Sequence, residues 1–286
     1  AAENGLLGEI YPEILDAETG FIDGSTVNVE ELMRLEPDVV FYNAARAELG
    51  EQLRNAGFAA IAVSVNKWDH DCIETLNQWI ALLGEIFPDN NKTELVEKRS
   101  HEMYEMVQER IAAIPEEEKE NVFFLYKYSD TSIETSGANF FGQWWAEATG
   151  SINVADELTT DNSVNVNMEQ IYEWDPDMIY ITNFVPYLAE DLYNNTAFEG
   201  HDWSVVRAVQ EGNVYKCPLG VYRWYPPSSD TPLMLLWMAK TNYPDLFADI
   251  DMEQEIRDYY KNFYNLELTD EDIVNIFNPT REVAGA

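Results

Sequence analysis

The stretch NVEELMRLEPDVVF at residues 28–41 recurs as NMEQIYEWDPDMIY at residues 167–180, at a constant offset of 139 positions. Asn, Glu, Pro and Asp are identical in the two copies, and most other positions keep their chemical type. Each copy predicts a short helix that starts at an Asn cap and ends before a proline, followed by Asp and a buried apolar strand. Chance recurrence of this order is the alternative, but the ungapped spacing favours two similar lobes.

Around both copies the sequence alternates between strand and helix patterns, which is typical of parallel sheets with right-handed crossovers. In the first half we expect helices at 28–36, 46–56 and 70–87, and strands at 38–43 and 58–64. In the second half we expect strands at 121–127, 152–154, 177–182 and 213–217, and helices at 139–149, 167–174 and 203–210. The predicted fold class is therefore α/β, with two Rossmann-like lobes.

A charged segment without Gly or Pro, residues 91–114, joins the two halves. As one helix it would be about 35 Å long, enough to cross between the lobes as a stiff strut. A coiled-coil partner is the alternative, but the heptad pattern is not sustained. We expect four parts: an N-terminal lobe at 1–90, an inter-lobe helix at 91–115, a C-terminal lobe at 116–240, and C-terminal helices at 241–286 that pack back on the lobes.

The first lobe has two predicted strands and the second has four. A two-stranded parallel sheet makes a poor core by itself. We therefore expect the first strands of the N-terminal lobe to be missing from this chain.

Composition and motif content exclude several classes of protein. The 53 acidic residues outnumber the 17 Lys and Arg, and the formal charge of −36 repels nucleic acid. Cys72 and Cys217 form no CxxC pair, and the three histidines are scattered, with His70 expected at an exposed helix start. The chain also lacks the sequence motifs of common hydrolases and nucleotide-binding enzymes. We expect neither catalysis nor a cofactor.

The order of these elements resembles the helix-hinged, class III solute-binding proteins of bacterial ABC importers. The matching stretches are residues 29–42, 140–155 and 168–180, and WSVVRAVQEGNVY at 203–215 with Pro218 after it. The resemblance implies a protein outside the cytoplasm, in the periplasm or lipid-anchored at the outer face of the cell membrane. It also implies an ABC permease as partner and a small-molecule ligand. A monomer is our default expectation for the oligomeric state.

The ligand that the resemblance favours is a ferric siderophore or similar metal chelate. A molybdate or tungstate oxyanion comes second, and a corrinoid or haem comes third. The alternative from another class is a hydrolase or metal enzyme that uses acidic residues in the same cleft.

Loops after the carboxyl ends of parallel strands should line the cleft between the lobes. The segment Tyr222-Arg223-Trp224-Tyr225, stiffened by two prolines, offers a flat aromatic wall around one cation. Alternatively, its aromatic residues pack under the next helix and Arg223 pairs with a carboxylate. Further candidates are Tyr126, Lys127 and Asn183 on the second lobe, and Asn43, Arg46 and Trp68 on the first.

Asn139, Gln143 and Trp144 form a second candidate group, at a predicted helix start. Unpaired backbone N–H groups at such a start attract oxyanions. An ordinary capped helix whose Trp residues belong to the core is an equally good interpretation of this stretch.

Overall fold

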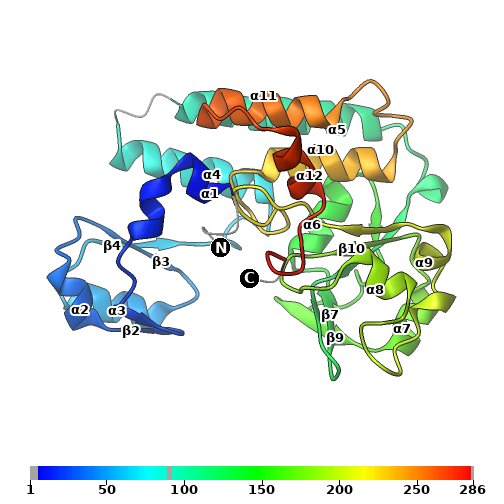
Figure 1. The fold of residues 1–286 in the computed structure, drawn as a ribbon, viewed down its shortest axis with the longest axis horizontal. Helices are drawn as coiled ribbons and strands as arrows, with labels where there is room; N and C mark the ends of the chain where they lie inside the picture. The colour runs from blue at the N-terminus through cyan, green and yellow to red at the C-terminus, as the bar shows by residue number, and fades with distance from the viewer. Residues whose placement is uncertain (1–5, 89–91, 285–286) are drawn as a thin grey trace.

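Two α/β lobes lie beneath a layer of helices in the computed structural model, which describes residues 6–88 and 92–284 (Figure 1). In lobe one, β3 (Val40–Asn43) pairs in parallel with β4 (Ala60–Val63), next to α2 (Val29–Arg34) and α3 (Ala47–Asn55). Lobe two has a four-stranded parallel sheet in the order β11-β10-β5-β8. Its strands are β5 (Asn121–Leu125), β8 (Ile152–Asn153), β10 (Met178–Ile181) and β11 (Val214–Lys216).

The sequence repeat is also a repeat of backbone structure. Helix α2 and strand β3 form the first copy, and α7 (Met168–Trp174) and β10 form the second. Asn28 and Asn167 both cap their helices, as predicted, with a side-chain oxygen that accepts backbone N–H groups. Glu36 and Asp175, which are equivalent in the repeat, both have positive φ angles, of 47° and 40°. Because non-glycine residues rarely adopt this conformation, the turn before each strand is the same local structure.

Several short elements were not predicted. The hairpin of β1 (Ile22–Asp23) and β2 (Thr26–Val27) precedes α2, and an antiparallel sheet in lobe two has the order β6-β7-β9. Its strands are β6 (Lys127–Tyr128), β7 (Ile133–Ser136) and β9 (Ser163–Val166). The remaining unpredicted short elements are α1 (Leu7–Ile10), η2 (Pro12–Asp16), η3 (Glu116–Glu118) and α8 (Ala189–Tyr193). The helix expected at 203–210 is present in two pieces, η4 (Trp203–Val205) and α9 (Arg207–Glu211). Elements of two or three residues carry too few residues to show a period.

The long helix expected between the lobes is present, and it lies in a layer together with other helices. Helix α5 (Thr93–Ile111) runs above both lobes, with α4 (Cys72–Ile86), α10 (Thr231–Asn242) and α11 (Met252–Tyr264) beside it (Figure 1). Ion pairs of 2.6 Å join α5 to the C-terminal region, from Arg99 to Glu255 and from Arg110 to Asp249. One apolar core extends from α4 through α5 and α6 (Phe141–Ala148) to α12 (Asp270–Phe277).

The two lobes differ in how well their sheets are buried. All four residues of β10 are buried, whereas β3 alternates and Phe41 is 39% exposed. A separate small cluster around Leu32, Leu49 and Leu53 forms the core of lobe one. An apolar cavity of about 570 Å³ adjoins β3, as expected for a lobe with only two parallel strands. Within the described residues, no helix has both the length and the apolar character needed to cross a membrane.

A candidate ligand cleft between the lobes

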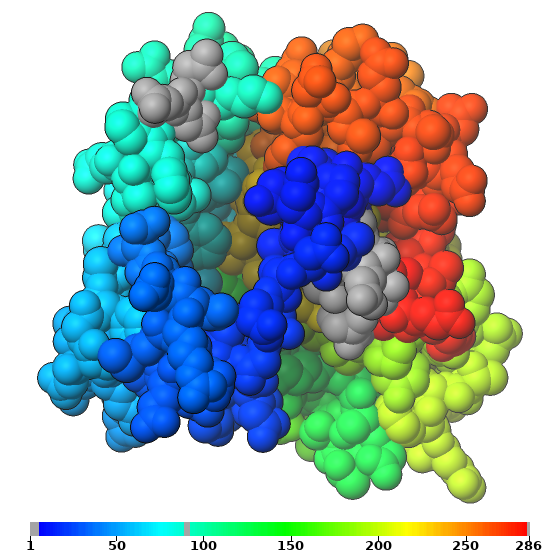
Figure 2. Space-filling view, turned by 60° about the vertical axis from the view of Figure 1, so that its left-hand side comes forward, coloured from blue at the N-terminus to red at the C-terminus, as the bar shows by residue number. Residues whose placement is uncertain are grey.

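The lobes approach each other where the loop after β4 meets the start of α6. The ring of His70, on that loop, lies 5.7 Å from the Phe140 ring and 5.2 Å from the Phe141 ring, measured between centroids. The surface is hollowed between the two lobes, and the N-terminal residues, in dark blue, run across the hollow (Figure 2). The residues around the contact between His70 and Phe140 form the candidate site.

A row of aromatic rings extends from this meeting point along the edge of lobe two. Phe140 lies 5.2 Å from Tyr126, and Tyr126 lies 5.0 Å from Phe184. The guanidinium carbon of Arg223 then lies 4.7 Å from the centre of the Phe184 ring. Tyr126 follows β5, Phe184 follows β10 and Arg223 follows β11, so the row lies at the carboxyl ends of the parallel strands. We name this row, from His70 to Arg223, the aromatic row.

The Arg223 guanidinium is fixed by hydrogen bonds and lies close to two aromatic rings. Its Nε donates to the Asn183 carbonyl at 2.7 Å, and its Nη1 donates to the Tyr222 hydroxyl at 3.0 Å. The Tyr222 ring centre lies 5.3 Å from the guanidinium carbon, and Tyr222 is 39% exposed. A planar cation between aromatic faces can pair with an anion and stack on a flat ligand.

The structure corrects the expectation that Trp224 and Tyr225 face a ligand. Both side chains are completely buried. The Tyr225 hydroxyl hydrogen-bonds Ser136 Oγ, and its carbonyl accepts the indole N–H of Trp145 at 2.7 Å. Burial holds the pKa of Tyr225 well above its ordinary value. These two residues therefore belong to the core behind Tyr222 and Arg223, and Tyr225 packs against β7 and α6.

Asn183 is also buried, with its side chain turned away from the cleft. Its amide donates to the carbonyls of Cys217 and Pro218 at 2.8 and 2.9 Å. Lys127 lies at the margin of the aromatic row, with its Nζ 5.3 Å from the Tyr126 ring centre and 3.7 Å from Glu134. Lys127 therefore lies next to the aromatic row, whereas the buried Asn183 contacts Arg223 through its backbone carbonyl.

The second candidate group is engaged in contacts within lobe two and the helical layer. Asn139 is exposed and donates to Asp161 at 3.1 Å, and Gln143 donates to Glu147 at 2.8 Å. Trp144 stacks on Tyr104 at 6.4 Å. Trp145 of the same helix is completely buried, as the interpretation with Trp residues in the core requires, and the contacts of this group give no support to an oxyanion site.

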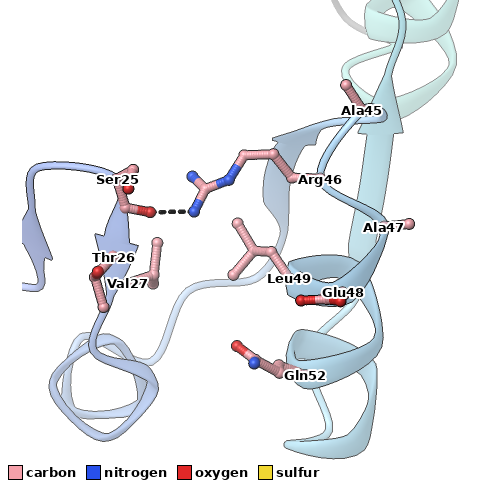
Figure 3. A pocket seen from close by; sticks show the side chains of 9 residues that line it. All are labelled: Ser25, Thr26, Val27, Ala45, Arg46, Ala47, Glu48, Leu49 and Gln52. Atoms are coloured by element: carbon pink, nitrogen blue, oxygen red, sulfur yellow. Dashed lines mark hydrogen bonds between the residues drawn. The ribbon is translucent and has the colours of Figure 1, made fainter.

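The lobe-one candidates make their contacts outside the aromatic row. The Arg46 guanidinium donates to the Ser25 carbonyl and lines a cavity of about 510 Å³ between the β1–β2 turn and the start of α3 (Figure 3). Asn43 Oδ1 accepts the Ala45 N–H at 2.9 Å, which is a local turn contact. Trp68 is partly buried, with Lys67 Nζ 4.8 Å from its ring centre.

His70 is the site residue that sequence reasoning missed. We expected an exposed side chain at a helix start, but Asp71 caps α4 and His70 packs against lobe two. Burial lowers the pKa of His70, against the opposing effect of Asp69 and Asp161. Asp69 and His70 both have positive φ, at 50° and 61°, a conformation for which non-glycine residues give little sequence signal. No group of three or more His, Cys, Asp or Glu suited to a metal ion occurs in the described parts of the chain.

Three comparisons relate the chain to known proteins. Residues 13–219 match the family model described as periplasmic binding protein. The molybdate-binding protein MolA of Haemophilus influenzae is 24% identical over 259 residues, which cover 85% of this chain and 71% of MolA.

Solved structures share the fold over nearly the whole chain. A periplasmic solute binding protein from Veillonella parvula has a TM-score of 0.84 and 29% identity, and the match covers 99% of this chain and 84% of that one. The nickel–histidine complex of CeuE from Helicobacter pylori has a TM-score of 0.75 at 18% identity, over 96% of this chain and 83% of that one.

Proposed function

The chain belongs to the periplasmic binding protein family, and from this premise we propose that it captures an anionic metal chelate of the ferric siderophore kind. The observation that carries the proposal is the Arg223 guanidinium, which lies 4.7 Å from the Phe184 ring at the end of the aromatic row. Ring faces bind flat, partly apolar chelating groups, and the guanidinium binds their negative charge. The protein would deliver this cargo to an ABC permease.

Capture of this kind makes and breaks no covalent bond. The lobes close on the ligand and reopen, and the helical layer of α4, α5, α10 and α11 keeps that motion small because packed helices bend little. We place this monomer outside the cytoplasm, in the periplasm or on a lipid anchor. We also retain the division into 1–90, 91–115, 116–240 and 241–286 as a proposal.

A molybdate or tungstate oxyanion is the second candidate ligand. The observation in its favour is the similarity to MolA, which is named as a molybdate-binding protein. The N–H groups of Arg223 and the hydroxyl of Tyr222 are donors of the type that bind such an oxyanion.

Ligand-induced thermal stabilisation tests both candidates. The panel contains the ferric complex of 2,3-dihydroxybenzoate, haem, cobalamin, nickel–histidine, molybdate and tungstate. A ligand at a hundredfold excess over its Kd stabilises the folded protein by about 2.7 kcal/mol. Selective stabilisation by the ferric complex is expected. Stabilisation by molybdate or tungstate alone would transfer the proposal to the second candidate, and no response from a folded protein would refute both.

A further inference from the structure

The loop that carries Arg223 rests on a buried carboxylate, Asp230. Asp230 is completely buried, and its Oδ2 accepts the backbone N–H of Val221 at 2.8 Å. The Tyr260 hydroxyl, 3.0 Å from the same N–H, donates to Asp230 Oδ1 at 3.1 Å. Among the described residues, no Lys or Arg forms an ion pair with Asp230. The loop therefore has an anionic acceptor beneath its tip, and no described Lys or Arg is paired with that acceptor.

The loop lies directly on the Asp230–Tyr260 pair. A Cβ atom built on Gly220 would overlap the Tyr260 hydroxyl and lie 2.6 Å from Asp230 Oδ2. The loop then closes on itself through an antiparallel bridge between Leu219 and Arg223, and the Gly220 N–H donates to the Tyr222 carbonyl at 3.1 Å. Fixing the Val221 N–H in so tight a turn fixes the backbone on which Tyr222 and Arg223 stand.

A buried carboxylate at this position lowers the stability of the folded protein. Burial raises the pKa of Asp230 to about 6, opposed by its hydrogen bonds, so the group is mainly ionised at pH 7. An ionised group without a cationic partner lowers the stability of a fold unless it is well hydrogen-bonded. Such a group is useful where a loop must be held in one conformation before its ligand arrives, because preorganisation strengthens binding.

We propose that Asp230, together with Tyr260, is a positioning group that holds Arg223 in place for the ligand without touching the ligand. This inference rests on the proposed function of the cleft, and it adds Asp230 as a residue that supports the binding site. If Asp230 has this role, removing its charge should weaken ligand binding without lowering the stability of the folded protein. A merely structural residue would lower both when it is replaced.

The test compares Asp230→Asn with the wild-type protein and with Asp245→Asn, which makes the same exchange at an exposed position. Isothermal titration with the ferric 2,3-dihydroxybenzoate complex should show at least about a fivefold rise in Kd for Asp230→Asn only. Its Tm should equal or exceed that of the wild type, because a buried charge has been removed. Unchanged Kd, or a lower Tm together with weaker binding, would overturn the proposal.

Hydrogen exchange without ligand separates this inference from the proposed function. The amides of residues 219–223 should exchange faster in Asp230→Asn than in the wild type or Asp245→Asn, since the Val221 N–H loses its charged acceptor. If the wild type fails to bind the ferric complex, the proposed function fails, and this exchange difference still decides whether Asp230 positions the loop. Should Asp230→Asn not fold, Tyr260→Phe must show the same faster exchange, and normal exchange there would reject the pair.

Discussion

Asn183 and Phe184 hold the two sides of Arg223: the carbonyl of Asn183 accepts its Nε at 2.7 Å, and the ring of Phe184 lies 4.7 Å from its guanidinium carbon. The two residues follow β10, whereas Arg223 follows the neighbouring strand β11. The contact therefore ties together loops at the carboxyl ends of adjacent strands. It gives Arg223 a fixed orientation at the carboxyl-end edge of the lobe-two sheet.

Replacing Arg223 should weaken ligand binding without unfolding the protein. We expect Arg223→Ala to raise the Kd for the ferric 2,3-dihydroxybenzoate complex at least about tenfold, or roughly 1.4 kcal/mol, because the charge-assisted contacts are lost. Phe184→Leu should have a smaller effect, since it removes the ring face but keeps the cation. Titration calorimetry measures the Kd of both variants. Arg34→Ala, which changes an arginine at an exposed helix end, is the control. Equal affinity in Arg223→Ala would leave that residue a purely structural role.

The two copies of the repeat should respond alike to loss of their helix caps. Asn28→Ala and Asn167→Ala each remove an oxygen that accepts backbone N–H groups at the start of a helix. We expect each change to lower the free energy of unfolding by about 1 kcal/mol. Urea denaturation followed by circular dichroism measures this, with the exposed Asn162→Ala as control. A loss equally large in the control would show that capping is not the cause.

The ion pair between Arg281 and Asp191 should hold the C-terminal segment on lobe two. Two contacts, of 2.6 and 2.8 Å, join the guanidinium to a carboxylate that is 8% exposed. Arg281→Ala should lower the free energy of unfolding by about 1–2 kcal/mol at pH 7, because a buried carboxylate loses its partner.

The effect of Arg281→Ala should depend on pH in a defined direction. Hydrogen bonds from Arg281 and the Leu188 N–H outweigh desolvation and lower the pKa of Asp191, so the pair stabilises the fold when this carboxyl is ionised. The difference from the wild type should therefore shrink as the pH falls and Asp191 becomes protonated. Denaturation curves at pH 7 and in acid check this. A difference that persists unchanged in acid would contradict the assignment to this ion pair.

The stability cost of Asp230 should appear as the pH rises. Burial raises its pKa from 3.8 to about 6, so the folded protein binds the proton more tightly than the unfolded chain does. The stability contributed by protonated Asp230 is present below pH 4 and is lost between about pH 4 and 6, by roughly 3 kcal/mol. The nearby hydroxyls of Tyr259, Tyr260 and Tyr264 have raised pKa values and remain neutral in this range.

Comparing denaturation of Asp230→Asn and the wild type at several pH values isolates this contribution from that of the other acidic residues. The stability of Asp230→Asn relative to the wild type should increase from pH 4 to pH 7. A constant difference over this range would mean that Asp230 does not titrate as its burial requires.

Local sequence features predicted most of the regular elements because their causes lie within a few residues. Asn28 and Asn167 cap their helices through N–H groups two or three positions along the chain. Pro37 and Pro176 end those helices, and apolar residues after them form β3 and β10. Apolar runs in the sequence also predicted the two parallel strands of lobe one, β3 and β4. The two-residue strands β1, β2 and β6 were not predicted, whereas the equally short β8 was expected at 152–154.

The candidate site was predicted only in part. Sequence placed Tyr126, Tyr222 and Arg223 on loops after parallel strands, and these loops do converge. It could not show that Trp224 and Tyr225 point into the core while Tyr222 points outward, because consecutive residues in a turn take directions set by distant packing partners such as Ser136 and Trp145.

The sequence by itself determined two related α/β halves, their capped helices and the strand ends that bear the polar and aromatic loops, since each follows from contacts within one or two turns of the chain. Only the tertiary structure decided that His70 meets Phe140 across the lobes and that Asp230 supports the loop of Arg223. Only it showed that α11 packs beside α5. These relations join segments that are remote in sequence or lie across a turn, and they depend on the packing of whole elements, which no local pattern encodes.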